Sequence, residues 1–372
     1  MPITLDGTNG ITTPTYGGAD TSEYLVPVTQ FKNRIINGAM VIDQRNAGAA
    51  VTTTGSYPVD RFYVNNSSDA TFSAQQSTDV PSGQGFVNSL KVTFPTGDAS
   101  IGATQYSNIQ QNIEGFNVAD LGFGGSGAKT VTLSFWVKAS VAGQYSYAIY
   151  NSAENRINPQ PFTINSANTW EQKSITYVGD TTGTWLTTNG KGLTVTVYMA
   201  LGSNFLGSAG WNAGGTYGVT GQANAMASNG NIFAITGVQL EVGSTATSFE
   251  YRQFTTELEL ASRYFQTTYN LGTALGTAST GSGVVGRTLD AQQSYPTLNW
   301  CMPVAMRTTP TVTYYSPITG ASGKAATQPN AADITASNFG YDGTKNVALI
   351  CNAITVPQSY GFYAHFACSA EL

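Results

Sequence analysis

The sequence predicts an all-β protein built from antiparallel strands, and three observations lead to this prediction. About ten short segments between Asn33 and Arg252 alternate apolar and polar residues, as a strand with one buried face does. Glycine-rich turns join these segments, and hardly any helical spacing of apolar residues separates them. Hydrophobic residues make up 41% and aromatic residues 11% of the 372 residues, far from the composition of a disordered chain. We therefore expect two antiparallel sheets packed face to face over residues 33–252.

The first 32 residues differ from the rest. They lack periodic apolar residues and are interrupted by glycine and proline at positions 7, 10, 14, 17, 18 and 27. Such a segment does not hold itself folded, so we expect 1–32 to be an arm ordered by neighbouring copies or by a structure to which it attaches; a frayed terminus is the alternative. The opening MPITLDGTNG resembles no signal peptide, and no run of 18 apolar residues occurs, so we expect synthesis in a cytoplasm and no membrane insertion.

Two segments far apart in the chain read as a pair. In the first, from Lys32 to Val64, alternation at Ile36, Gly38, Met40 and Ile42 predicts a strand, and Asn46-Ala47-Gly48 predicts a turn. In the second, GVQLEVGSTATSFEYR from Gly237 to Arg252, alternation at Val238, Leu240 and Val242 predicts another strand.

From Asn33 to Arg252 the other expected strands follow one another: DRFYV, ATFSAQQ, NSLKVTF, TQYSNIQQNI, KTVTLSFWVKA, QYSYAIY, TWEQKSITYV, GLTVTVYMAL and NIFAITGVQLEV. Two of them show clear apolar faces, made of Val131, Leu133, Phe135 and Val137 in one and of Leu193, Val195, Val197 and Met199 in the other. These faces are the expected core.

One helix follows. In FTTELELASRYFQTTY the spacing of Phe254, Leu258, Ala261 and Phe265 predicts an apolar stripe, and Thr256 with Glu259 fits a capping box. We expect a connecting helix over 253–268. Strand patterns then resume, so residues 269–372 are expected to form a second, C-terminal β-sandwich domain.

NRIINGAMVIDQR, YPVDRF, GVQLEVGSTATSFEYR and TELELASRYFQ are similar, in order and spacing, to segments of a family of bacteriophage tail-fibre and related virion proteins. The resemblance covers Asn33 to Gln266 and implies a jelly-roll sandwich of carbohydrate-binding-module type, on a fibre that contacts the host surface. Phe62 stands where relatives often have Trp, and Ala261 where they often have Cys.

Fibre relatives are commonly homotrimers, so the resemblance implies this state too. Around one axis the arms could bury Ile3, Leu5, Ile11, Leu25 and Val26 against one another. The implied partners are other copies of the chain, tail or baseplate proteins bound through the arm, and host cell-surface glycan. The implied location is the tail fibre of a virion assembled in the host cytoplasm.

The composition is poor in charge. Only 10% of residues are charged, the net charge is -5, and mean hydropathy is -0.11, so the surface must consist largely of Thr, Ser, Asn, Gln and Gly. Such a surface suits sugar hydroxyls and rigid assemblies, whereas net negative charge disfavours nucleic acid. The alternative is that low charge marks only a stable β-rich protein.

Catalytic and metal-binding patterns are sparse. His365 is the only histidine, and three cysteines at 301, 351 and 368 lack paired spacing, so we expect a structural histidine and small buried cysteines. A glycosidase pair would have to be assembled by folding from the scattered carboxylates Glu154, Glu171, Glu241, Asp60, Asp120 and Asp180. We expect no enzyme activity, catalytic residue, cofactor or metal.

Aromatic residues flanked by glycine are the best binding candidates, because a flat ring can stack on a sugar. Trp185, Trp211 and Tyr217 fit this description. Packing against a neighbouring chain or over the sandwich edge is the alternative for each. Two functions therefore remain open: a tail-fibre attachment module that binds glycan non-covalently, and a purely structural virion component such as a connector or decoration.

Overall fold

A computed structural model describes residues 4–6, 10–12, 31–281, 283–289, 293–294, 296–328, 332–338, 340, 342–351, 355–356 and 360–372. The chain divides into two units, 1–32 and 33–372. In the first, β1 (Thr4–Asp6) pairs antiparallel with β2 (Gly10–Thr12). The side chains expected to bury one another between arms, those of Ile3, Leu5, Ile11, Leu25 and Val26, lie outside the described residues.

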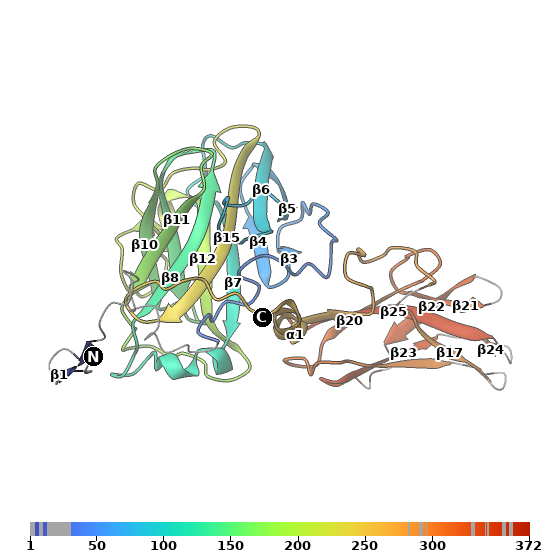
Figure 1. Cartoon of the computed structure of the whole chain (residues 1–372). Coiled ribbons are helices and arrows are strands. Elements are labelled where there is room, and N and C mark those ends of the chain that lie inside the picture. Colours follow the sequence, from blue (N-terminus) through green and yellow to red (C-terminus); the bar gives the residue numbers. More distant parts are fainter. Residues whose placement is uncertain are drawn as a thin grey trace. The chain divides into compact units, whose positions relative to one another are not determined.

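Residues 56–242 form two antiparallel sheets, seen as two layers in Figure 1. The six-stranded sheet has the order β10 (Ile157–Ile164), β9 (Gly143–Tyr150), β12 (Lys191–Leu201), β7 (Tyr106–Glu114), β4 (Phe62–Asn66), β3 (Ser56–Val59). The five-stranded sheet has the order β11 (Glu171–Tyr177), β8 (Val131–Ala139), β15 (Asn231–Val242), β6 (Ser89–Thr96), β5 (Thr71–Ser77). The predicted all-β antiparallel fold class is confirmed.

One core fills the space between these sheets. The two predicted apolar faces, on β8 and β12, lie in it with at most 1% of each side chain exposed. Each large apolar side chain so buried contributes roughly 1.5–3 kcal/mol. The alternate residues of the same strands face outward, and on the six-stranded sheet that outward face carries the site described below.

Two strands of these two sheets were not expected, and prolines explain why. β10 contains Pro159 and Pro161, and β3 contains Pro58. Each strand lies at an edge of the six-stranded sheet, where a missing N–H interrupts no ladder between two neighbours.

The paired segments do lie side by side, but the first is not a strand. Asn37 and Met40 have φ values of 60° and 59°, and the Met40 amide donates to the Asn37 carbonyl at 2.9 Å, so the chain turns where a strand was expected over 36–42. The Arg34 amide donates to the Leu240 carbonyl at 2.9 Å, and the Val238 amide donates to the Gly38 carbonyl at 3.0 Å. The expected turn at 46–48 and the strand in the second segment, part of β15, are confirmed.

Helix α1 (Phe254–Ser262) is shorter than the expected 253–268. Its N-cap is Gln253, which makes no capping hydrogen bond, so the predicted Thr256–Glu259 capping box is wrong. The expected stripe is also incomplete, because Phe254 is exposed and Phe265 belongs to strand β16. The helix is tied down instead by the buried Glu257 carboxylate, which accepts a hydrogen bond from the Asn37 amide.

Most strands after α1 form a curled antiparallel sheet around a second core. Its order is β16 (Phe265–Thr267), β25 (Gly361–Ser369), β21 (Lys324–Gln328), β22 (Ala332–Asn338), β23 (Asn346–Cys351), β19 (Thr297–Cys301), and both β17 (Val285–Thr288) and β20 (Thr311–Tyr315) also pair with β25. Short β18 (Gln293–Ser294) pairs with β24 (Thr355–Val356).

His365 and the three cysteines lie on strands of this sheet. His365 is buried on β25, with Nδ1 3.2 Å from Thr268 Oγ1 and Nε2 2.9 Å from the Ser279 carbonyl, which confirms a structural histidine. Cys368 is buried as expected, but Cys301 is exposed on β19, so that part of the prediction is wrong. The side chain of Cys351 lies outside the described residues.

The last two residues, Glu371 and Leu372, contact the sandwich. Glu371 pairs with Arg61 and, at 2.9 Å, with Arg45, and Arg45 also pairs with Asp60 at 2.8 Å. Asn112 of β7 donates to the Leu372 carbonyl at 2.8 Å.

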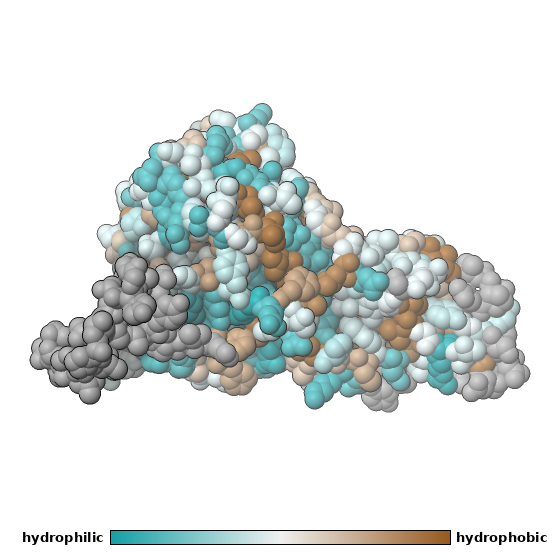
Figure 2. Space-filling model, viewed as in Figure 1, coloured by the Kyte–Doolittle hydropathy of each residue, from teal (hydrophilic) through white to brown (hydrophobic). Residues whose placement is uncertain are grey.

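Polar and intermediate residues cover most of the sandwich face seen in Figure 2.

Candidate functional site

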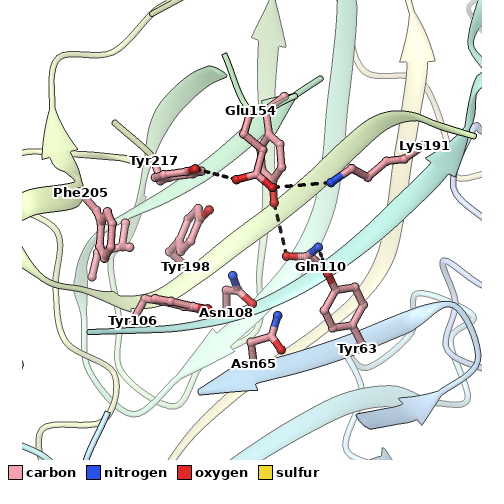
Figure 3. A pocket seen from close by; sticks show the side chains of 12 residues that line it. Tyr63, Asn65, Tyr106, Asn108, Gln110, Glu154, Lys191, Tyr198, Phe205 and Tyr217 are labelled. Atoms are coloured by element: carbon pink, nitrogen blue, oxygen red, sulfur yellow. Dashed lines mark hydrogen bonds and ion pairs between the residues drawn. The ribbon is translucent and has the colours of Figure 1, made fainter. Parts of the chain in front are cut away.

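A groove of about 250 Å³ lies on the outward face of the six-stranded sheet (Figure 3). Strands β4, β7, β9 and β12 supply its floor, and loops supply its walls. Its lining consists of Tyr63, Asn65, Tyr106, Asn108, Gln110, Tyr150, Glu154, Lys191, Tyr198, Leu201, Phe205 and Tyr217.

Strand register places the floor residues in two rows across the sheet. One row runs Thr196, Gln110, Tyr63, and the next runs Tyr198, Asn108, Asn65. Because side chains alternate along a strand, the intervening Ile109, Val197 and Val64 face the core, and the polar and aromatic residues face the groove.

Aromatic rings form one wall. Tyr217 lies edge-to-face with Tyr150 at 5.9 Å, with Tyr198 at 6.2 Å and with Phe205 at 5.8 Å between ring centroids. The short parallel pair β13 (Leu206–Gly207) and β14 (Gly218–Val219) fixes this wall, and the Tyr217 amide donates to the Phe205 carbonyl at 2.9 Å. The rings are therefore held by backbone contacts before any ligand arrives.

The floor holds a buried acceptor without a partner. Asn108 is 4% exposed, and among the described residues nothing hydrogen-bonds its Oδ1 atom. Leaving a buried polar atom unsatisfied costs about 1–3 kcal/mol, so a ligand hydroxyl or N–H at this point would gain a well-placed acceptor.

The neighbouring row is already bonded. Gln110 Nε2 donates to the Tyr63 hydroxyl, and the Tyr150 hydroxyl donates to Gln110 Oε1 at 3.4 Å. Burial raises the pKa of the Tyr150 and Tyr198 phenols, so both stay neutral at physiological pH. The groove therefore offers apolar ring surface and uncharged hydrogen-bonding groups.

Charge is confined to one part of the lining. The Tyr217 hydroxyl donates to Glu154 Oε2 at 2.7 Å, and Lys191 Nζ lies 3.6 Å from Glu154 Oε1. Among the described lining residues, Glu154 and Lys191 are the only two with charged side chains.

The structure separates the three residues that the sequence singled out. Tyr217 lines the groove, whereas Trp185 and Trp211 pack edge-to-face with each other at 5.6 Å and with Phe123 against the sandwich core. Their indole N–H groups donate to backbone carbonyls, that of Trp211 to Val178 at 2.9 Å and that of Trp185 to Thr182 at 3.2 Å. Glycan contact by these two tryptophans stays a prediction.

The sequence analysis did not predict the floor residues, because it used only the apolar residues that alternate along each strand and face the core. The floor residues lie on the opposite face of the same strands. The usable signal was the other face: in TQYSNIQQNI the outward positions include Asn108, Gln110 and Asn112, three amides in succession. A polar face made of amides and not of charges is a feature of a surface that binds uncharged polar ligands.

The carboxylates considered for a glycosidase pair interact with other side chains. Each of four has a basic partner, in the pairs Asp60–Arg45, Asp120–Arg34, Asp180–Arg156 and Glu171–Lys173. Glu241 accepts from the Thr247 hydroxyl at 2.6 Å. Among the described residues lining the groove, Glu154 is the single carboxylate.

No family model matches the chain, and no curated protein matches it. The enzymatically active domain of bacteriophage CBA120 tailspike protein 4 is similar to it at 14% identity and a TM-score of 0.31, over 57% of this chain and 22% of that one. The xylan-binding domain from carbohydrate-binding family 22 is similar at 14% identity and a TM-score of 0.29, over 54% of this chain and 99% of that one. The family 11 carbohydrate-binding module of the Clostridium thermocellum cellulase Lic26A-Cel5E is similar at 11% identity and a TM-score of 0.28, over 54% of this chain and 98% of that one.

This chain thus spans less than a quarter of the tailspike chain. Within the described part of the chain, no helix is long and apolar enough to span a membrane. The same residues contain no group of three or more His, Cys, Asp or Glu side chains able to hold a metal ion.

Proposed function

We propose that this chain binds carbohydrate non-covalently in the groove and serves as a host-attachment component of a bacteriophage tail fibre. The observation behind the binding proposal is the unpartnered Asn108 Oδ1 on a floor walled by aromatic rings. A sugar ring presents hydroxyl donors and an apolar C–H face, and this arrangement offers an acceptor for the first and ring surface for the second. The tail-fibre role rests on the sequence resemblance over Asn33 to Gln266.

Such a site is weak by itself, since a neutral hydrogen bond contributes about 1 kcal/mol net. Firm attachment needs several copies acting together, which raise the effective concentration of the second and third sites. We therefore also propose a homotrimer that joins other tail or baseplate proteins through residues 1–32 and is located in the virion. Light scattering should give about three times 39.1 kDa, and a monomer at micromolar concentration would refute the trimer.

A purely structural virion component without glycan binding is the second candidate. It is favoured by the internal hydrogen bonds of Gln110, Tyr63 and Tyr150, which already satisfy one row of the floor.

A glycan array with purified protein, followed by a host-cell adsorption assay, separates the two candidates. Asn108→Ala should lower binding about tenfold, the factor that corresponds to ~1.4 kcal/mol, because it removes the floor acceptor. Gln172→Ala is the matched control, since it deletes an exposed amide on β11 of the other sheet. Trp185→Ala and Trp211→Ala test the two tryptophans. Glycan binding that Asn108→Ala leaves unchanged, or no binding by the wild type, would remove the groove proposal.

A further inference from the structure

We infer that Glu154 makes the groove selective for uncharged sugars over acidic sugars, an inference that rests on the proposed glycan binding. Glu154 is the one carboxylate among the described lining residues, and its position is defined by the loop that carries it. Figure 3 shows it among Tyr217, Lys191 and Gln110.

The loop between β9 and β10 holds Glu154 in place. Glu154 has a positive φ of 55°, which few residues other than glycine adopt, and its amide donates to the Asn151 carbonyl at 3.1 Å. The fully buried Asn151 bonds the rest of the loop, because its Nδ2 donates to Asn155 Oδ1 at 2.7 Å and its Oδ1 accepts from the Arg156 amide at 3.2 Å. The carboxylate is therefore presented by a short, internally bonded loop.

The carboxylate retains acceptor capacity. A carboxylate has about four acceptor positions, and the Tyr217 hydroxyl and the Lys191 ammonium lie at two of them. Its side chain is 43% exposed. Sugar hydroxyls entering the groove can donate to the remaining positions.

Lys191 does not provide an equal site for an anion. Its side chain is only 23% exposed, its Nζ lies 3.6 Å from Glu154 Oε1, and the same atom lies 5.8 Å from the Tyr150 ring centroid. A uronic or sialic acid in the groove would bring its carboxylate toward Glu154, and the like charges would repel. An uncharged sugar meets no such penalty.

The test compares neutral glycans with uronate- and sialate-bearing glycans on one array, for wild type, Glu154→Gln and Glu259→Gln. Glu259 is exposed on α1, outside the groove lining, so its substitution changes net charge equally and serves as the matched control. Circular dichroism confirms that each variant is folded. Tyr217→Phe keeps the Glu154 charge and should keep wild-type selectivity.

Wild type and Glu259→Gln should bind neutral glycans preferentially. Glu154→Gln should raise the ratio of acidic to neutral binding about tenfold, because the repelling charge is gone and Lys191 is released. Raising the salt concentration to about 1 M, where the Debye length is ~3 Å, should raise this ratio for wild type but not for Glu154→Gln.

Preferential binding of acidic glycans by wild type, or an unchanged ratio in Glu154→Gln, would overturn this inference. If Asn108→Ala still weakens binding in that case, the proposed function stands and only the selectivity of Glu154 is refuted. A wild type that binds no glycan would overturn both.

Discussion

Glu371→Gln should destabilise the protein strongly, because it unbalances a buried group of four charges. Arg45 and Arg61 face Asp60 and Glu371, and the Glu371 and Arg61 side chains are 8% and 2% exposed. Arg61 also lies over the Tyr264 ring, 3.5 Å from its centroid, where water does not replace a lost partner. The substitution leaves two cations against one anion.

Removing one partner of a buried ion pair costs about 3–5 kcal/mol. We expect a loss near the lower end, about 3 kcal/mol, because glutamine still accepts a hydrogen bond from one of the two guanidinium groups. Urea unfolding followed by tryptophan fluorescence measures this loss. Glu259→Gln, on an exposed part of α1, should change stability by less than about 0.5 kcal/mol.

A double variant tests the reasoning about charge. Arg61→Met combined with Glu371→Gln restores one cation against one anion, so the two losses should be markedly less than additive. A loss below about 1 kcal/mol for Glu371→Gln, or additive losses in the double variant, would refute the account.

Three further predictions concern the fold. Gly38→Ala should cost at least ~2 kcal/mol in a denaturant melt, because its Cβ would lie 2.1 Å from the Val238 carbonyl oxygen; an unchanged midpoint would contradict this close approach. Burial raises the pKa of the Tyr177 and Tyr198 phenols, so the folded state keeps protons that the unfolded state releases. Stability should then be unaffected below pH 10 and fall above it by up to ~1.4 kcal/mol per pH unit for each tyrosine, measured by urea melts at stepped pH. Trp211→Ala should lower stability by about 3 kcal/mol while Trp211→Phe costs less, since phenylalanine keeps most of the contact with Phe123; equal thermal melts for both variants would argue against this packing role.

The alternation of apolar and polar residues correctly predicted strands with one apolar face, such as β8. The burial of such a face depends only on the spacing of apolar residues within the strand. The segment 36–42 shows the limit of this reasoning. Its apolar residues alternate, but positive φ values at Asn37 and Met40 and the Asn37 side chain, which donates to the Ile42 and Asp60 carbonyls, make it a turn. The bond to Asp60 joins residues that are distant along the chain, and the spacing of apolar residues does not encode the positive φ values.

The groove was harder to predict than the core for a similar reason. Asn108 and Tyr198 are neighbours only through the register of β7 against β12, and 90 residues of sequence separate them. Tyr217 was singled out from its glycine-rich loop, and it does reach the groove because β13 and β14 hold that loop in place. Trp185 and Trp211 occur in similar loops, yet their rings pack together against the core.

The backbone contacts between the paired segments also affect how the sandwich could be rearranged. Because Arg34 bonds to Leu240 and Gly38 bonds to Val238, the chain enters and leaves the sandwich at neighbouring points. A unit whose ends are adjacent can be inserted into a loop of another protein without distorting the fold of either protein. For the same reason, a circular permutant that joins the region after Val242 to Asn33 and opens the chain at an exposed turn should keep the groove intact, since none of the four residues that make these backbone contacts lines the groove.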